Sequence, residues 1–290
     1  MALLGILLGA LEKRYAPKIE RRILFDNSRK LTNALIEGNN WILSHEKSGT
    51  TFLCNMIACR NLAFSGNITA FNMDQIYKGG VFRSVSDASK TVMDLAAFAQ
   101  SNAFGCPVFV HTHEAFPAEF KKSIMLSRNL FDQLISSYNF LYARRSSRQN
   151  VAFNDILEKM VRRYCRLLNF QLETLSARST DALLIRYEDL MREPVKSYQM
   201  IFRFLELQTS DSVIEKCLER TSPAAVKTHE SQTGKALVAG SNYEASSFIR
   251  SGEIGEHNAA LSTVHKEKIH SIVDEYQFTR NTLEKIVFCL

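Results

Sequence analysis

Short apolar segments alternate with longer stretches of helical periodicity through the middle of the chain, and this alternation predicts the fold. The apolar segments that we expect to be strands are residues 41–43, 107–110, 123–126 and 182–187. Helices are expected at 52–58, at about 132–142, and after residues 188–190 as one long amphipathic helix through Leu205. Continuous apolar strands separated by helices are typical of a parallel sheet that is covered on both faces. We therefore predict a three-layer α/β fold around a central parallel sheet of four or five strands.

Polar residues follow each of these predicted strands directly. They lie within residues 44–45, 111–113, 127–129 and 188–190. In a parallel sheet the carboxyl ends of the strands share one edge, and open α/β sheets bind their ligands at that edge. The sequence therefore predicts that one crevice gathers these separate segments.

The composition is that of an ordinary folded protein and excludes several classes. Of the 290 residues, 46% are hydrophobic and 23% charged, with 12 Gly and 5 Pro, which excludes disorder, collagen and low-complexity sequence. No Pro-, Gly- or Ser-rich linker divides the chain, so we expect a single domain over 1–290. Within it we expect an N-terminal helical extension at 1–38 and the motif-bearing core at 40–260. The apolar run 1–11 is too short to cross a bilayer; it predicts a buried or interfacial helix, with weak membrane contact as the alternative.

The charge balance suggests an anionic partner without identifying it. Lys and Arg number 36 against 30 Asp and Glu, a formal charge of +6, and nucleic acid, anionic lipid or a phosphorylated small molecule would each suit such a chain. The basic residues are not interleaved with aromatic residues as in a single-strand binding surface, so we expect no nucleic acid. The six cysteines lie far apart without a C-x-x-C pair, which predicts reduced core thiols and a cytoplasmic protein.

Residues 47–51, Lys-Ser-Gly-Thr-Thr, have the chemistry of a phosphate-binding loop. Gly49 permits close approach of the backbone to a ligand, and the hydroxyl groups can donate hydrogen bonds. The helix that follows offers unpaired N–H groups and the positive end of its dipole to an anion. The order differs from a Walker A loop, G-x-x-x-x-G-K-[ST], in which the Lys follows the last Gly. Taken alone, the loop is equally compatible with an ordinary helix N-cap beside an unrelated Lys.

The same loop resembles the K-S-G-T-T-W loop by which sulfotransferases hold the 5′-phosphosulfate end of 3′-phosphoadenosine 5′-phosphosulfate (PAPS). Four further segments resemble that family's pattern, in its order and at its spacing. They are 111–113 (the family's K-T-H), 127–138 (R-N-x-x-D-x-x-x-S-Y), 185–194 (Y-E-D-L) and 248–255 (F-M-R-K-G-x-x-G). By this resemblance the chain is identified as a member of the sulfotransferase family.

The resemblance implies a fold like that of the P-loop kinases and a PAPS-dependent transfer of the sulfuryl group to a small-molecule hydroxyl or amine. The product would be 3′-phosphoadenosine 5′-phosphate (PAP), and no metal would be required. His113 would be the base, since an unperturbed His pKa of about 6.5 lies near working pH. Lys47 would neutralise the charge that grows on the bridging oxygen. Ser136 and His111, which stands in the place of a family Lys, complete the implied catalytic group.

The resemblance also implies a donor site. The 5′-phosphate would lie on the loop 47–51, and the 3′-phosphate would lie on Arg128, Ser136 and Arg250. Adenine would lie among Phe52, Tyr187 and Thr221. The full set of implied donor-binding residues is Lys47, Ser48, Gly49, Thr50, Thr51, Phe52, Arg128, Ser136, Tyr187, Thr221, Phe248, Ile249, Arg250, Ser251 and Gly252.

The chain departs from the family pattern at several positions. Glu46 stands where the family usually has Pro, Phe52 where it has an adenine-stacking Trp, and Thr221-Ser222-Pro223 where it has T-S-F. Ser251 replaces a Lys and so removes one cation from the 3′-phosphate site. The dimerisation motif of many animal members has no good counterpart after Gly255, so the oligomeric state stays open.

Three alternatives also stay open. His111 and His113 share one face of a predicted strand, which is the spacing of a His-x-His metal pair, although the sequence offers no evident third ligand. A small-molecule kinase with a P-loop-like site is an alternative enzyme. A nucleotide-binding scaffold that has lost turnover is the non-enzymatic alternative, and the identity of the acceptor is undetermined among aromatic alcohols, carbohydrates, alkaloids and lipids.

Overall fold

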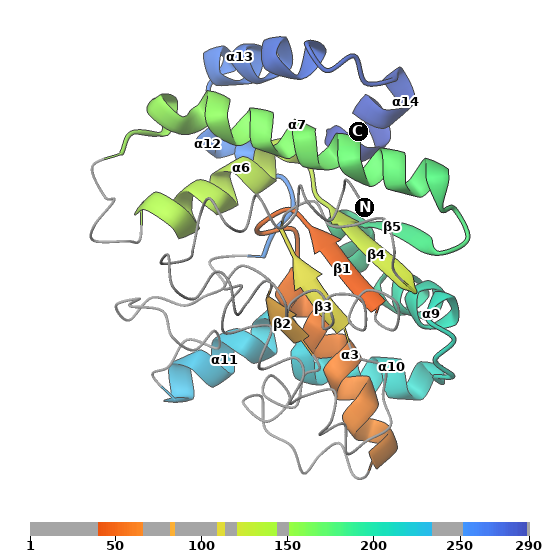
Figure 1. Cartoon of the computed structure of the whole chain (residues 1–290). Coiled ribbons are helices and arrows are strands. Elements are labelled where there is room, and N and C mark those ends of the chain that lie inside the picture. Colours follow the sequence, from red (N-terminus) through yellow and green to blue (C-terminus); the bar gives the residue numbers. More distant parts are fainter. Residues whose placement is uncertain are drawn as a thin grey trace, which may run out of the picture.

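The computed structural model of the chain describes residues 40–65, 82–84, 109–113, 121–143, 151–233 and 252–288. Within these residues five parallel strands form one sheet in the order β2-β3-β1-β4-β5 (Figure 1). The strands are β1 (Asn40–Ser44), β2 (Phe82–Ser84), β3 (Phe109–Thr112), β4 (Lys122–Ser127) and β5 (Ala182–Arg186). The predicted parallel sheet is therefore confirmed, with β1 at its centre between β3 and β4.

Helices cover both faces of the sheet. Successive side chains of each strand point to opposite faces and so belong to two different apolar cores. Ile42 and Ile124 pack with α3 (Thr50–Ser65), α9 (Pro194–Phe204) and α10 (Asp211–Thr221). Trp41, Leu43 and Met125 instead pack against α7 (Phe153–Ala177) on the other face. This division follows from the two-residue period of a strand, and it gives the three layers seen in Figure 1.

A third apolar core lies outside the sheet and is shared by α6 (Leu130–Tyr138), α7 and the C-terminal helices. Leu134 of α6, Leu168 of α7 and Ile269 of α13 are among its fully buried members. The remaining elements are η2 (Asn139–Ala143), α8 (Tyr187–Arg192), α11 (Pro223–Thr233), α12 (His257–Ala260), α13 (Thr263–Asp274), α14 (Arg280–Thr282) and η4 (Leu283–Val287). Because α7 packs on both the sheet and α6, it fixes α6 relative to the strand ends.

The prediction of one unbroken helix after residues 188–190 and through Leu205 is wrong. The structure divides it into α8 and α9 at Glu193, which has φ −128° and ψ 60°. Pro194 is the cause, because a proline disfavours the helical region for the residue before it but is well accommodated as the first residue of the next helix. Tyr187, predicted as the last strand residue, is instead the first residue of α8.

Other boundaries also differ from the prediction. Helix α3 begins at Thr50, inside the predicted loop. Helix α6 begins at Leu130, because the Asn129 side chain caps it by accepting hydrogen bonds from the backbone N–H groups of Phe131 and Asp132. The predicted helix over 132–142 ends as the π-helical turn η2. Strand β2 was not predicted, because three residues are too few to show a period.

The cysteines that the structure describes agree with the prediction of reduced core thiols. Cys54, Cys59, Cys165 and Cys217 are buried free thiols. Burial raises the pKa of the Cys54 thiol, and it raises that of Cys165 to about 12, so both stay protonated and unreactive at neutral pH.

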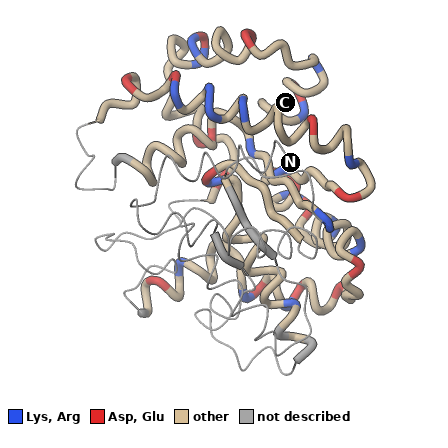
Figure 2. The backbone as a smooth tube through the Cα atoms, in the orientation of Figure 1, with Lys and Arg blue, Asp and Glu red and all other residues tan. Residues whose placement is uncertain are grey.

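The predicted extension 1–38, with its apolar run 1–11, lies outside the described residues. Of the helices that are described, none is long and apolar enough to cross a membrane. Lys and Arg residues are spread along the described helices with Asp and Glu residues among them, as Figure 2 shows. On α7, for example, Arg162 pairs with Glu158 and Glu275 at 2.8 and 2.6 Å.

Candidate active site

The loop between β1 and α3 lies at the carboxyl end of the central strand. The hydroxyl of Ser44, the last residue of β1, is 2.6 Å from the hydroxyl of Thr50, which ties the strand end to the first turn of α3. Gly49 has φ 92°, and a Cβ added there would lie only 2.6 Å from Cδ2 of Tyr187. Glycine is therefore needed twice, for its backbone conformation and for its lack of a side chain. The loop leads into the N-terminus of a 16-residue helix, which is the geometry of an anion site.

Ser48 supplies a group that points to a ligand. Its side chain is fully buried, and its Oγ atom has no hydrogen-bond partner among the described residues. Buried hydroxyls are normally hydrogen-bonded, since leaving one unpaired costs stability. An anionic oxygen bound at this loop would satisfy it.

Lys47 precedes this serine and has an unusual backbone. Its φ is 65°, in the left-handed region that favours glycine. Its ammonium nitrogen lies 4.4 Å from the centroid of the Phe140 ring, which belongs to the π-helical turn η2. Turns of this kind occur frequently at functional sites, and here the turn brings an aromatic face to the loop cation.

His113 follows β3 directly and reaches the end of β1. Its Nδ1 atom lies 2.8 Å from the carbonyl oxygen of Ser44 and 3.2 Å from the Ser44 hydroxyl. A carbonyl oxygen can only accept, so Nδ1 carries the proton and donates it. The neutral imidazole therefore keeps its lone pair on Nε2, which is the tautomer of a base.

Arg128 connects the loop 47–51, the phosphate loop, to the described end of the segment 248–255, which we call the late segment. One guanidinium nitrogen donates to the Lys47 carbonyl at 3.0 Å, and another donates to the Glu253 carbonyl at 3.1 Å. The guanidinium carbon lies 4.4 Å from the centroid of the Tyr187 ring. Its buried Nε atom has no partner among the residues that the structure describes.

The late segment is anchored to α6 and α8 by buried groups. Tyr187 donates its hydroxyl to the Gly252 carbonyl at 2.7 Å, and burial raises the pKa of this phenol. Asp132 is fully buried and accepts from the backbone N–H groups of Gly255 at 2.7 Å and His257 at 3.0 Å. The same carboxylate lies 2.8 Å from Nδ1 of His257. These contacts hold residues 252–257 beside the phosphate loop.

Comparison with known proteins agrees with this geometry. The family model of the sulfotransferase domain matches residues 38–283. The chain belongs to the sulfotransferase family. It is 24% identical over 239 residues to sulfotransferase 1E1 of Bos taurus, which covers 78% of this chain and 79% of the relative. The protein is thus an enzyme of the transferase class, and the family predicted from the motifs is confirmed.

Solved sulfotransferase structures share the fold. Retinol dehydratase in complex with androsterone and PAP has a TM-score of 0.60 and 16% identity, with 87% of this chain and 84% of that chain covered. Mouse sulfotransferase SULT7A1 complexed with PAP has a TM-score of 0.61 and 16% identity, with 88% and 91% covered. The predicted α/β fold of the sulfotransferase type is therefore confirmed.

The structure brings several predicted site residues of this sulfotransferase together. The loop 47–51, His113, Arg128 and Tyr187 meet around the ends of β1 and β4, linked by the contacts above. Ser136 lies half-buried on α6.

Two residues predicted for the adenine site make contacts within the protein in this structure. Thr221 is buried at the end of α10 and donates its hydroxyl to the Cys217 carbonyl at 2.8 Å. Phe52 packs edge-on against Tyr198 of α9, with ring centroids 5.8 Å apart. Their contact with adenine stays a prediction.

Other predicted residues are only partly described or lie outside the description. His111 lies on β3, opposite Ile42 of β1 in the parallel register. Phe248, Ile249, Arg250 and Ser251 lie outside the described residues, which begin again at Gly252. In the described part of the chain, His, Cys, Asp and Glu form no group of three that could hold a metal ion.

Several residues that support the site had no predicted role in it, although His45 belongs to the predicted crevice. His45 is buried, stacks on Tyr164 with centroids 4.1 Å apart, and donates Nε2–H to the Tyr164 carbonyl at 3.1 Å. Burial lowers the pKa of His45 to about 3, so it is neutral beside the loop. Asp132, Gln133 and Ser137 lie within the predicted 127–138 segment, but the motif assigned none of them a role. Gln133 and Ser137 bind the Glu46 carbonyl of the loop.

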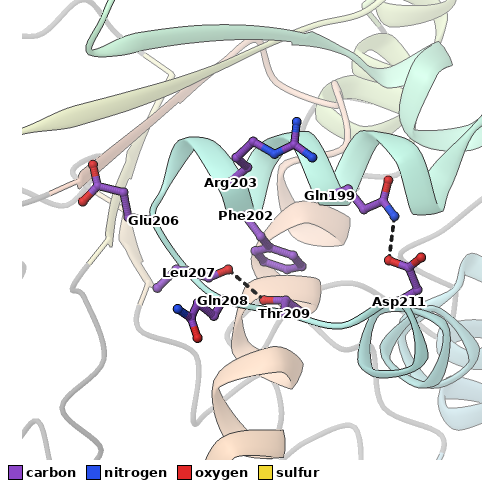
Figure 3. Close-up of a pocket in the computed structure, with 8 residues that line it drawn as sticks. All are labelled: Gln199, Phe202, Arg203, Glu206, Leu207, Gln208, Thr209 and Asp211. Carbon is purple, nitrogen blue, oxygen red and sulfur yellow. Dashed lines mark hydrogen bonds between the residues drawn. The ribbon is translucent and has the colours of Figure 1, made fainter.

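A pocket of about 640 Å³ lies elsewhere, between the end of α9 and the start of α10 (Figure 3). Phe202, Glu206 and Asp211 are among the residues that line it. Glu206 pairs at 2.6 Å with Lys122, the first residue of β4. The pocket is therefore at the amino-terminal edge of the sheet, opposite the phosphate loop, and is separate from the candidate active site.

Proposed function

We propose that this sulfotransferase transfers a sulfuryl group from PAPS to a hydroxyl or amine of a small-molecule acceptor. The observation that carries the proposal is the placement of His113, whose Nδ1–H is held by the Ser44 carbonyl at 2.8 Å beside the phosphate loop. The structural relatives support the donor and the class of acceptor, since retinol dehydratase binds PAP together with androsterone. The cytoplasm would be the site of action, where buried thiols such as Cys54 stay reduced.

The loop residues fit the 5′-phosphate of such a donor. The buried Ser48 hydroxyl lacks a partner among the described residues, Gly49 leaves the backbone open to close approach, and the Lys47 ammonium adds a positive charge. PAPS, when bound, supplies an activated sulfuryl group linked to this phosphate. Thr50 and Thr51, at the start of α3, would direct hydroxyl and N–H groups to the same oxygen atoms.

The reaction would need two groups of the protein to act on opposite sides of sulfur. His113 would accept the acceptor's proton at Nε2 while the acceptor's oxygen or nitrogen forms its bond to sulfur. Lys47 would stabilise the electron pair of the broken sulfur–oxygen bond, which remains on the 5′-phosphate oxygen. Ser44 would keep His113 in the tautomer that can accept a proton. His111 and Ser136 would assist from β3 and α6.

The 3′-phosphate and the adenine of PAPS would be held by residues from other segments of the site. Arg128, Ser136 and Arg250 would bind the 3′-phosphate, with residues 248–252 closing over it. Arg128 would also keep the two loops together through its bonds to the Lys47 and Glu253 carbonyls. Phe52, Tyr187 and Thr221 would surround adenine.

The first experiment is a thermal-shift titration with PAP, with 5′-AMP, ADP and ATP as controls, because a ligand that binds only the native state raises apparent stability. We expect selective stabilisation by PAP. Ser48→Ala should weaken PAP binding several-fold without lowering the melting temperature of the free protein, because the deleted hydroxyl is unpaired. Ser123→Ala is the matched control, since its buried Oγ also lacks a partner among the described residues but lies at the amino end of β4.

Turnover is then tested with ³⁵S-labelled PAPS and a panel of acceptors that includes androsterone, retinol, a simple phenol and a primary amine. Transfer of label to at least one acceptor is the expected result. Stabilisation by ATP together with phosphoryl transfer would instead support the kinase alternative. Selective PAP binding without transfer to any acceptor would support a scaffold that has lost turnover.

A further inference from the structure

The left-handed backbone of Lys47 needs an external cause. Its φ of 65° lies in a region that residues with a side chain seldom occupy. Such a conformation persists only where surrounding contacts hold it, and it occurs mostly at functional sites. The contacts that hold Lys47 come from two residues of α6 and from Arg128.

The peptide before Lys47 is held by Gln133 and Ser137, which we call the α6 clamp. Gln133 Nε2 donates to the Glu46 carbonyl at 2.9 Å, and the Ser137 hydroxyl donates to the same oxygen at 3.3 Å. The two side chains lie one helical turn apart and are joined to each other by a 2.9 Å hydrogen bond. Both are buried, with 5% and 2% of their surface exposed, so water does not compete strongly for these bonds.

The peptide after Lys47 is held from the other side. Its carbonyl accepts a hydrogen bond from Arg128 at 3.0 Å. The side chain of Glu46 also pairs with Arg163 of α7 at 2.6 Å, but both groups are partly exposed, so this pair contributes little. The buried clamp and Arg128 therefore fix the peptide planes on the two sides of Lys47.

Fixed peptide planes determine where the Lys47 side chain points. The φ and ψ angles of a residue are the only soft backbone torsions between its two peptide planes, so holding both planes sets the direction of its Cα–Cβ bond. From this starting direction the Lys47 side chain extends so that its ammonium lies 4.4 Å from the Phe140 ring centroid. We propose that Gln133 and Ser137 are positioning residues that aim Lys47 at the leaving-group side of the transferred sulfuryl group.

The inference rests on the proposed function, because it assigns the α6 clamp a role only through Lys47. Its test is a set of double-mutant cycles between the clamp and Lys47. Two quantities are measured: the dissociation constant of PAP by calorimetry, which requires no acceptor, and the rate of PAP release from PAPS at saturation with the best acceptor of the panel.

Removing the clamp should impair both quantities. We expect Gln133→Leu to reduce the rate about tenfold and Ser137→Ala to reduce it about threefold, since small misplacements of a catalytic group are costly. The double variant should be little worse than Gln133→Leu, because both residues hold one carbonyl oxygen. Ser137→Thr keeps the hydroxyl donor and should retain most of the rate.

The decisive comparison is made in a Lys47→Ala background. There the clamp substitutions should change the rate and the dissociation constant by less than about 1.5-fold, because no side chain remains to be aimed. A clamp effect that persists undiminished without the Lys47 side chain would overturn the proposal, as would normal kinetics of the folded clamp variants in the presence of Lys47.

Matched controls separate this role from a loss of stability. Gln171→Leu removes a buried glutamine that donates to the strand carbonyls of Leu43 and Leu126. Ser197→Ala removes a buried hydroxyl that donates to the Asp189 carbonyl. Both should lower the melting temperature by amounts similar to the clamp variants while kinetics at a permissive temperature stay normal.

Failure of the inference is distinguishable from failure of the proposed function. If Lys47→Ala itself leaves PAP binding and transfer unchanged, the role of Lys47 in the proposed function is wrong. If Lys47→Ala impairs both while the clamp variants do not, only the positioning role is wrong. If Gln133→Leu does not fold, the same cycle is run with Ser137→Ala alone. That substitution is the milder one, because it deletes a single oxygen atom, which makes the longer of the two bonds to the Glu46 carbonyl.

Discussion

Replacing Gly49 by Ala tests the close approach between the phosphate loop and Tyr187. At φ 92° an alanine costs about 1–2 kcal/mol. The added Cβ would also lie 2.6 Å from Cδ2 of Tyr187. That ring is held by the Arg128 guanidinium at 4.4 Å and by a hydroxyl bond to the Gly252 carbonyl, so it cannot move aside freely. Overpacking adds about 1–3 kcal/mol, for a total loss of about 2–5 kcal/mol in unfolding free energy.

Gly255 offers a matched control on the late segment. It has a similar φ of 87°, but the nearest atom to an added Cβ is the Asn258 side-chain nitrogen at 3.6 Å, an ordinary contact. Gly255→Ala should therefore show the conformational cost without the steric one. We expect Gly49→Ala to be less stable than Gly255→Ala by about 1–3 kcal/mol.

The loss of unfolding free energy in each variant is measured by urea denaturation. Unfolding is monitored by circular dichroism and by the fluorescence of Trp41, which is the only tryptophan of the chain and is buried. In a Tyr187→Leu background the cost of Gly49→Ala should fall to that of Gly255→Ala, because the ring that the methyl group meets is gone. PAP affinity should fall with Gly49→Ala, since the loop must shift. Equal destabilisation by the two alanines would refute the reasoning that Tyr187 limits the loop at Gly49.

Three further predictions concern the base, the late segment and the pH dependence of stability. His113→Ala should lower kcat by about 10²–10⁴ while the PAP dissociation constant stays within about twofold; calorimetry that shows PAP binding lost as well would argue against a role as base. Asp132→Asn should weaken PAP binding about tenfold, because an amide cannot accept every bond that the carboxylate takes from Gly255 and His257. Asp155→Asn, an exposed acid in the first turn of α7, is its control, and an equal effect of both would remove the anchoring role. His45 has a folded pKa lowered by burial to about 3, so the unfolded chain takes up its proton first as pH falls below about 6.5, and stability should fall by about 2 kcal/mol between pH 7 and pH 5. In His45→Phe the fall in unfolding free energy between pH 7 and pH 5, measured by urea denaturation, should be smaller by about 2 kcal/mol. An unchanged pH dependence would contradict the attribution of this fall to His45.

The sequence was sufficient for the features that depend on local pattern. The runs at 41–43 and 123–126 predicted strands because nearly all of their residues are apolar, as is typical of a strand that is buried on both faces. The phosphate loop was recognisable because Gly49 and the residues around it follow one another directly in the chain. The family followed from five such short segments, and each of them is legible without knowledge of the fold.

The tertiary structure decided what depends on residues far apart in the chain. That His113 donates to Ser44, and so keeps its Nε2 lone pair, depends on the parallel pairing of β1 and β3. The left-handed conformation of Lys47 depends on Gln133 and Ser137 of α6, whose helix is placed by packing against α7. No local pattern encodes these contacts, since a side chain that binds the backbone of a distant loop needs only the right position and one donor. Sequence therefore determined which groups are available for chemistry, and packing determined how they are oriented, because orientation is set by the sum of many weak contacts between separate elements.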